Sequence, residues 1–205
     1  MSRIAIIGTG GHARECLEAA RAAGREIACF LDEDESRWGE TLLDVSVASG
    51  GLEAIRALDS GDELLIAVGD NRARARIASE LAGARVATLV HPFSSVSGSA
   101  EISAGAMIFA GCVIQTACRV GRHAILNTSA SLSHDCSIGD FSHVAVGSHL
   151  AGNVSVGEGA LIGAGVSARP GVSVGDWAVV GAGSAIVSDI PGNVTAYGEA
   201  HARSR

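Results

Sequence analysis

A period of six residues governs the hydrophobic positions between Ser94 and Ile186. Every sixth position is a large aliphatic residue except Ala168, and two residues before each of them stands a small or slim side chain. Neither the period of an amphipathic helix nor the alternation of a half-buried strand fits this pattern. The sixfold positions are Val96, Ile102, Ile108, Ile114, Val120, Leu126, Leu132, Ile138, Val144, Leu150, Val156, Ile162, Ala168, Val174, Val180 and Ile186.

This repeat predicts a parallel β-helix. Each hexapeptide supplies a short strand and a corner, and three of them close one triangular coil. The repeats make about five coils, which stack at ~4.8 Å into a prism about 25 Å tall. We expect the aliphatic side chains to stack inside the prism and the small ones to lie near its tight corners. The period itself does not fix the hand of the coil.

The residues before the repeat follow a different pattern, in which apolar strands alternate with helices. This alternation predicts an α/β domain with a small Rossmann-like parallel sheet covered on both faces. His91-Pro92 breaks the pattern and Pro191-Gly192 ends the repeat, so we predict domains at 1–91 and 92–190 and a C-terminal cap at 191–205. The predicted strands are 3–7, 27–31, 64–68 and 85–90, and the predicted helices run from the first glycine turn to about Ala23, closed by Gly24, and over 51–58 and 72–81.

Composition narrows the class of protein. Hydrophobic residues make up 47% of the chain but aromatic residues only 3%, which suits a core of stacked aliphatic side chains. No apolar run approaches ~18 residues, so we expect no membrane insertion, and the start of the chain predicts no signal peptide. A net charge of −7 without a basic patch argues against nucleic-acid binding. Five cysteines without a CxxC pair predict a reducing, cytoplasmic location.

A glycine-rich turn carries the first candidate site. Gly8-Thr9-Gly10-Gly11-His12 leads into the first helix, and the N–H groups of such a helix start fit a phosphate or pyrophosphate. Asp32 ends the second strand, and Asp70 and Asn71 follow the third, at the edge where open parallel sheets bind ligands. We interpret the glycines as ligand-binding. For Asp32, Asp70 and Asn71, a purely structural role stays equally open.

The second candidate site lies inside the repeat. Four histidines, His123, His134, His143 and His149, fall outside the two repeat positions that form the core, so we expect none of them to fill it. An imidazole acts as a general base near neutral pH, and the carboxylate of Asp135 is adjacent to His134. A solvated corner also accommodates a His-Asp pair. We interpret His123 and His149 as having no functional role.

The motifs together resemble one family. Gly-Gly-His in the first turn, Leu-Asp-Glu and Gly-Asp-Asn at strand ends, and the run from Asn127 to Val154 are similar to the NeuD/PglD-type bacterial sugar acyltransferases. The resemblance covers nearly the whole chain and is most specific around His134. It implies a left-handed β-helix and an acetyl-CoA-dependent N-acetyltransferase. The implied acceptor is the 4-amino group of a nucleotide-linked amino-deoxy sugar.

The resemblance also assigns roles by position. It makes His134 the general base and Asp135 its partner, places acetyl-CoA against His143 and against the backbone amide of Gly152, and implies no metal. The rest of acetyl-CoA would run along Ala164 and Ala182. The nucleotide sugar would lie against Gly8, Gly10, Gly11, His12, Asp32, Asp70 and Asn71. The chain departs from the family pattern at 196–200, where Ala-Tyr-Gly-Glu-Ala replaces Gly-x-Pro-Ala.

The flat faces of a triangular prism predict a homotrimer, with acetyl-CoA held between two subunits. Three alternatives remain at this stage. The first is an O-acetyltransferase acting on a sialic acid or another sugar hydroxyl, and the second is a zinc carbonic anhydrase on the same scaffold, which needs three converging histidines. The third is a non-catalytic β-helix partner protein. The sequence leaves the choice among UDP, GDP and dTDP sugars open.

Overall fold

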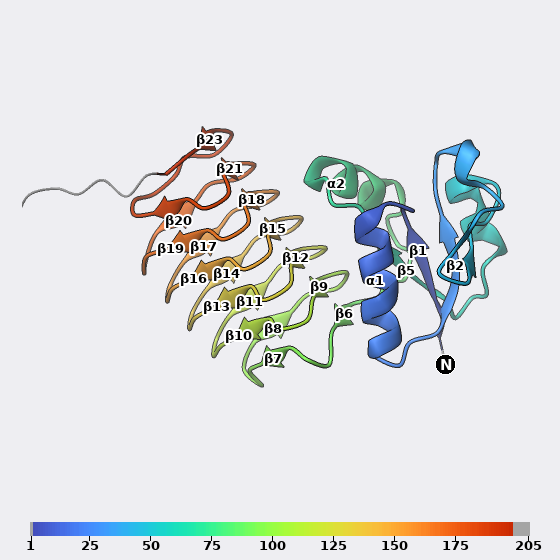
Figure 1. Cartoon of the computed structure of the whole chain (residues 1–205), viewed down its shortest axis with the longest axis horizontal. Helices are drawn as coiled ribbons and strands as arrows, with labels where there is room; N and C mark the ends of the chain where they lie inside the picture. The colour runs from blue at the N-terminus through green and yellow to red at the C-terminus, as the bar shows by residue number, and fades with distance from the viewer. Residues whose placement is uncertain (1, 199–205) are drawn as a thin grey trace, which may run out of the picture. The chain divides into compact units, whose positions relative to one another are not determined.

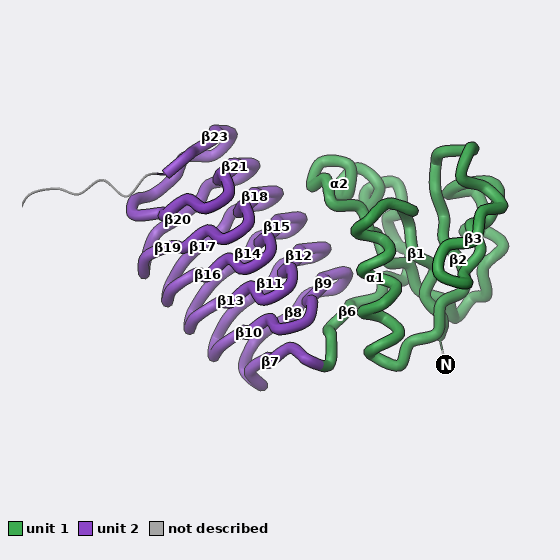
Figure 2. Tube along the Cα trace, viewed as in Figure 1, with its two compact units in different colours: residues 1–92 green, residues 93–205 purple. Residues whose placement is uncertain are grey.

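The computed structural model of this chain describes residues 2–198, which fall into two compact units (Figure 2). Unit 1 comprises residues 1–92 and unit 2 residues 93–205. The expected cap thus lies partly outside the described residues, since Glu199 to Arg205 are not among them. Within residues 2–198, none of the helices combines the length and the apolar character that crossing a membrane would require.

Unit 1 is built on a parallel sheet of three strands in the order β2-β1-β5 (Figure 1). The central strand is fully buried because all four of its residues are apolar. The strands are β1 (Ile4–Ile7), β2 (Ile27–Leu31) and β5 (Glu63–Ile66), and the helices are α1 (Gly11–Ala22) and α2 (Asn71–Glu80). Gly24 follows α1 with φ +70°, as expected for the glycine that ends a helix.

The fourth predicted strand of unit 1, residues 85–90, is wrong as an element. Only β6 (Leu89–Val90) is a strand there, and Val86 forms a single bridge to Leu64. The Leu64 N–H donates to the Arg85 carbonyl, and the Ala87 N–H donates to the Leu64 carbonyl. After Ala87 the chain leaves the edge of the sheet. A short apolar run does not reveal how long it stays paired.

Other segments of unit 1 also differ from the expectation. The predicted helix at 51–58 is a 3₁₀ helix, η2 (Gly51–Ala57), and a second one, η1 (Glu35–Arg37), was not foreseen. A hairpin of β3 (Thr41–Leu42) and β4 (Val45–Ser46) was also missed. Its two turn residues, Leu43 and Asp44, have φ values of +47° and +67°. Positive φ at both positions matches the twist of a two-residue hairpin, but neither residue is the glycine that usually marks such a turn in a sequence.

Unit 2 is a parallel β-helix whose two-residue strands recur every six residues and form three faces (Figure 1). The first face holds β7 (Ser95–Val96), β10 (Val113–Ile114), β13 (Ser131–Leu132), β16 (His149–Leu150), β19 (Ser167–Ala168) and β22 (Ala185–Ile186). The second holds β8 (Glu101–Ile102), β11 (Arg119–Val120), β14 (Ser137–Ile138), β17 (Ser155–Val156) and β20 (Ser173–Val174). The third holds β9 (Met107–Ile108), β12 (Ile125–Leu126), β15 (His143–Val144), β18 (Leu161–Ile162), β21 (Val179–Val180) and β23 (Thr195–Ala196).

The sixfold pattern describes the interior of unit 2 correctly. The aliphatic residues and the small residues two positions earlier form one buried cluster from Ala106 to Ile186. Val96 and Ile102 are only partly buried, since they belong to the first coil and have no coil before them. At the corners one residue takes a left-handed conformation, for example Asp135 (φ +60°) and Asn153 (φ +59°), because the chain must turn there.

One histidine contradicts the expectation that all four lie outside the core. His123 is only 2% exposed. It occupies a corner with φ +53°, and its ring stacks on Phe141 at 5.4 Å between ring centroids and packs over Gly105. Corner residues of successive coils lie above one another, so they form a packed column of their own. The prediction that only two positions of each repeat are buried does not include this third column of corner residues.

Candidate active site

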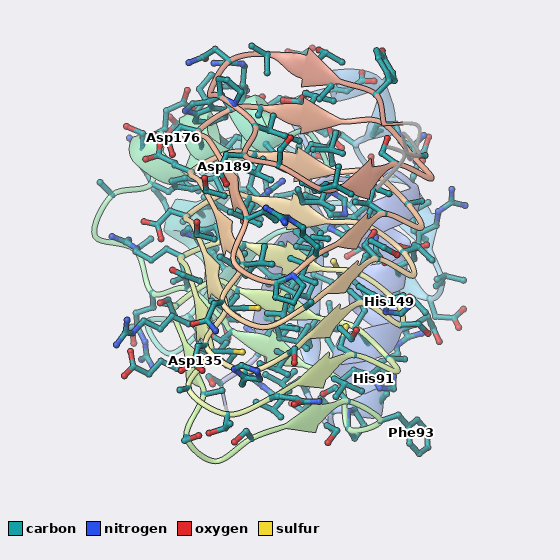
Figure 3. All side chains as sticks on the ribbon, turned by 90° about the vertical axis from the view of Figure 1, so that its left-hand side faces the viewer. His91, Phe93, Asp135, His149, Asp176 and Asp189 are labelled. Atoms are coloured by element: carbon teal, nitrogen blue, oxygen red, sulfur yellow. The ribbon has the colours of Figure 1, made fainter. Side chains whose placement is uncertain are left out.

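His134 and Asp135 lie at the corner between β13 and β14. The Asp135 Oδ2 and His134 Nδ1 atoms are 2.8 Å apart, and the two side chains are 51% and 52% exposed. Figure 3 shows Asp135 on the outer surface of the β-helix. A carboxylate at Nδ1 favours the tautomer in which Nδ1 carries the hydrogen and Nε2 keeps its lone pair. In that tautomer Nε2 is the nitrogen of His134 that can accept a proton.

Gly152 lies at the same corner, one coil further along the chain. A Cβ atom placed on Gly152 would lie 2.5 Å from both Cε1 and Nε2 of His134, so the imidazole packs directly over the glycine backbone. The backbone of the next residue, Asn153, donates to the carbonyl of His134. The Gly152 N–H makes no hydrogen bond with any residue in the 2–198 part of the chain. A backbone N–H group thus lies beside Nε2 of His134.

His143 contacts the side chain of Asn127, which lies in the preceding coil. The Asn127 Nδ2 and His143 Nε2 atoms are 3.4 Å apart, and Asn127 Oδ1 accepts a hydrogen bond of 2.7 Å from the backbone N–H of Thr128. Because Oδ1 is engaged in this way, the amide nitrogen of Asn127 faces the imidazole and donates to it. Sequence reasoning passed over Asn127, although it opens the run that carries the family resemblance.

The residues assigned to acetyl-CoA do not lie together in one chain. His134, Asp135 and Gly152 share the corner between the first and second faces, whereas His143 belongs to β15 on the third face, opposite that corner. Ala164 follows β18 and Ala182 follows β21, so both lie at the corner between the third and first faces. A single β-helix therefore presents three separate parts of the predicted site.

The glycine turn of unit 1 lies between β1 and α1. Gly8 has φ +107°, and a Cβ there would meet the carbonyl oxygen of Ala67 at 3.0 Å. The fold itself therefore requires glycine at this position. Gly10 is the N-cap of α1 with φ −73°, and neither it nor Gly11 would bring a Cβ within 4 Å of another atom. The backbone at Gly10 and Gly11 is therefore open to a ligand.

His12 follows this turn and is mostly buried, with 15% of its side chain exposed. Burial lowers the pKa of His12 to about 4, and the positive charge of Arg74 acts in the same direction. His12 is thus a neutral imidazole at physiological pH. Its ring nitrogens lie 3.7 Å from Glu15 Oε2 and 3.8 Å from Cys16 Sγ.

The acidic and amide residues at the strand ends have partners inside unit 1. Asp32 accepts 2.5 Å from the hydroxyl of Thr9 and 3.0 Å from the Asp34 N–H. Asp70 caps α2 by accepting from the Ala73 N–H at 2.8 Å. Asn71 Oδ1 accepts from Arg74, a residue that belongs to none of the motifs noted in the sequence. These contacts explain the three residues as parts of the fold at the same edge as the glycine turn.

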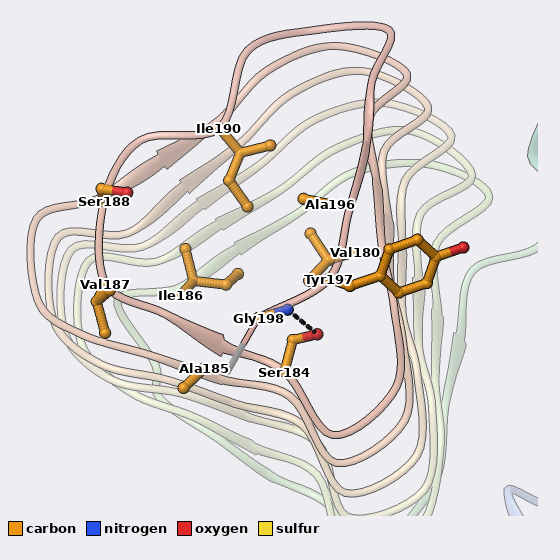
Figure 4. Close-up of a pocket in the computed structure, with 10 residues that line it drawn as sticks. All are labelled: Val180, Ser184, Ala185, Ile186, Val187, Ser188, Ile190, Ala196, Tyr197 and Gly198. Carbon is orange, nitrogen blue, oxygen red and sulfur yellow. Dashed lines mark hydrogen bonds between the residues drawn. The ribbon is translucent and has the colours of Figure 1, made fainter. Parts of the chain in front are cut away.

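A cavity of about 190 Å³ lies at the far end of the β-helix (Figure 4). Aliphatic residues of the last coils, Ile186 and Ile190 among them, line it together with Tyr197, and the Gly198 N–H donates to Ser184 Oγ at 3.0 Å. Ala196, Tyr197 and Gly198 belong to the segment that departs from the family pattern. The other two residues of that segment, Glu199 and Ala200, lie outside the described residues.

Across residues 2–198, no three His, Cys, Asp or Glu side chains come together as a possible metal site. The cysteines Cys112, Cys118 and Cys136 are buried in the β-helix, and their thiols donate to backbone carbonyls. Burial raises the pKa of Cys112 and of Cys136 to about 11. These thiols are therefore packing residues, as their place in the repeat predicts.

Comparison with known proteins agrees with this architecture. Residues 3–81 match the PglD N-terminal domain family. Perosamine N-acetyltransferase from Caulobacter crescentus, solved with CoA and GDP-perosamine as a variant with one histidine changed to asparagine, is 36% identical to this chain. The match covers 97% of this chain and 94% of that chain, with a TM-score of 0.90.

Two further structures extend the comparison. The acetyltransferase domain of PglB from Neisseria gonorrhoeae, in complex with acetyl coenzyme A, is 34% identical over 96% of each chain, with a TM-score of 0.87. WeeI from Acinetobacter baumannii is 23% identical over 97% of each chain, with a TM-score of 0.88, and supports the fold alone. The predicted fold, a small α/β parallel sheet followed by a left-handed β-helix, is confirmed.

Proposed function

The chain belongs to the PglD-type family of left-handed β-helix sugar acetyltransferases, and we propose that it N-acetylates a nucleotide-linked amino sugar with acetyl-CoA. The acceptor is the 4-amino group of a deoxy sugar. The observation that carries the proposal is the corner of unit 2 where His134 Nδ1 meets Asp135 at 2.8 Å and the imidazole packs over Gly152.

The chemistry is a direct transfer. The amine nitrogen bonds to the thioester carbonyl carbon, and Nε2 of His134 takes the proton that the amine loses. Asp135 keeps the hydrogen on Nδ1 and stabilises the imidazolium. The Gly152 N–H donates to the oxyanion, the carbon–sulfur bond then breaks, and the CoA thiolate leaves and regains a proton. No acyl-enzyme forms in this scheme.

A homotrimer would complete the site. His134 lies opposite β15 in its own prism, so His143 and the corner with Ala164 and Ala182 serve the same acetyl-CoA only if a neighbouring chain supplies them. A threefold arrangement brings such different edges together at each of its equivalent interfaces. Light scattering at micromolar concentration is expected to give three chains, and a monomer with full activity would rule this arrangement out.

The nucleotide sugar is assigned to unit 1. The open backbone at Gly10 and Gly11 faces solvent at the N-terminus of α1, where anions are favoured. GDP-perosamine is the first acceptor to test, because a similar acetyltransferase was solved with it. The corresponding UDP- and dTDP-linked 4-amino sugars belong in the same screen, together with a sugar in which a hydroxyl replaces the amine.

The test is the rate of CoA release from acetyl-CoA with each acceptor. His134→Ala is expected to lower kcat by roughly 10²–10⁴-fold and His134→Asn nearly as much, whereas Asp135→Asn should cost less. The melting temperature should hardly change, since the imidazole is half exposed. A folded His134→Ala protein with kcat within a few-fold of wild type would refute the assigned base, and exclusive use of the hydroxyl acceptor would favour O-acetylation.

A further inference from the structure

A buried arginine lies at the sheet edge that carries the glycine turn. Arg74 belongs to the first turn of α2, and its side chain is 0% exposed. Arginine is rarely buried completely, because its charge must then be stabilised by hydrogen bonds in place of water. The proposed chemistry at His134 does not use this residue.

The guanidinium of Arg74 binds the turn between β5 and α2. Nη1 donates to the carbonyl oxygens of Val68 at 2.8 Å and Gly69 at 3.3 Å, and Nη2 donates to Asn71 Oδ1 at 2.7 Å. These three acceptors are the successive parts of the chain that leave the sheet at its carboxyl edge. One side chain thus holds the shape of this turn.

The same positive charge reaches the start of α1. The turn that Arg74 holds packs against the glycine turn before α1, since a Cβ on Gly8 would lie 3.0 Å from the carbonyl oxygen of Ala67 and 3.4 Å from Cγ2 of Val68, the residue whose carbonyl accepts from Arg74. The positive charge of Arg74 also lowers the pKa of His12 in the first turn of α1. Burial lowers the pKa of Arg74 to about 10, and Asp70 opposes this shift from the N-cap of α2. At neutral pH the buried group therefore remains charged. The other acidic side chain in this region is that of Glu15, which lies near His12 and is 62% exposed.

We propose that Arg74 is a positioning residue of the diphosphate subsite, which holds the β5–α2 turn and supplies a fixed positive charge near the N-terminus of α1. The inference rests on the proposed function, because it assumes that a nucleoside diphosphate group binds at Gly10 and Gly11. A helix N-terminus alone offers about half a positive charge. A buried cation is screened by salt less than a surface one, so its charge acts on a bound diphosphate more strongly.

Arg76 provides a matched control two residues along the same helix. Its guanidinium is half exposed and forms ion pairs with Glu33 at 2.8 Å and Glu80 at 2.7 Å. Removing its charge should therefore leave the subsite unchanged. The pair Arg74→Gln and Arg74→Lys separates the two parts of the proposal, since both lose the planar fork but only glutamine loses the charge.

The experiment measures affinity by calorimetry for GDP, UDP and dTDP and for guanosine, uridine and thymidine, at low and high salt. For the diphosphate that the wild type binds best, Arg74→Gln should weaken binding roughly tenfold or more at low salt, and most of this loss should persist at high salt because a buried charge is screened little. The affinity for the matching nucleoside should stay within about twofold. Arg74→Lys should remain within about threefold of wild type for the diphosphate, and Arg76→Gln should not differ from it.

Equal losses of diphosphate and nucleoside affinity in both Arg74 variants would overturn the proposal, because they would mean that Arg74 only holds the fold. If Arg74→Gln has no melting transition, Arg74→Lys decides alone. Diphosphate affinity near wild type then supports the proposal, and a tenfold loss shared with the nucleoside overturns it. A wild-type chain that binds none of the three diphosphates would instead refute the proposed function, and this inference with it.

Discussion

The packing of His134 over Gly152 allows the proposed base to be displaced without being removed. In Gly152→Ala the new Cβ would lie 2.5 Å from Cε1 and Nε2 of His134. Carbon contacts are favourable only at about 3.5–4.0 Å, so the ring must move by about 1 Å. Gly152 is not among the glycines with positive φ, and the alanine keeps the backbone N–H, so the imidazole position is the feature that changes.

A misplacement of about 1 Å at a reacting group costs on the order of 10²-fold in rate. We therefore expect Gly152→Ala to lower kcat about 10²-fold. The melting temperature should remain close to wild type, because the ring is half exposed and can swing toward solvent. Gly98→Ala is the matched control, since Gly98 has no positive φ and a Cβ there meets nothing within 4 Å.

A double-mutant cycle then attributes the effect. If Gly152→Ala acts through the imidazole, it should change kcat little in a His134→Ala background. The assay is CoA release at saturating acceptor, with folded protein quantified for every variant. The reasoning would be refuted by a Gly152→Ala enzyme with wild-type kcat, or by the same loss in both backgrounds.

Three other outcomes are expected. Gly10→Val should weaken nucleotide-sugar binding roughly tenfold and leave the KM for acetyl-CoA unchanged. The fold has room for the new side chain, but its methyl groups would block the approach of a phosphate to the backbone. An equal loss of affinity for both ligands would contradict this prediction. The pKa of His12 is lowered to about 4 from 6.5, so the unfolded chain binds more protons between these values, and the free energy of unfolding should fall by about 2 kcal/mol from pH 7 to pH 5 in urea titrations. His12→Gln should flatten that dependence, and an unchanged slope would argue against the burial of this imidazole. Ile162→Ala should lower the free energy of unfolding by about 2–5 kcal/mol, as for a fully buried side chain, and a loss below 1 kcal/mol would mean that the interior of unit 2 relaxes around the cavity.

The interior of unit 2 can be predicted from the order of its residues alone. A side chain that recurs every sixth residue can be buried only if the chain turns at the same interval, so the pattern specifies the strands, the corners and the stacking of coils. The sequence also identified the α/β pattern of unit 1 and the pair His134–Asp135, because adjacent residues need no tertiary information to be neighbours. The hand of the coil came from the family resemblance, which the comparisons confirm.

Which distant residues meet depends on how the folded elements pack against one another. The contact of His134 with Gly152 joins successive coils, and the burial of His123 depends on the corner residues above and below it. The pairing of residues 85–87 is short because this segment leaves β5 after Leu64, although β5 continues to Ile66. The burial of Arg74 had no signal in the sequence, because a charged residue in the first turn of a helix is usually solvated. Periodicity reports which way a side chain faces along its own element, whereas these contacts are set by the elements that pack against it.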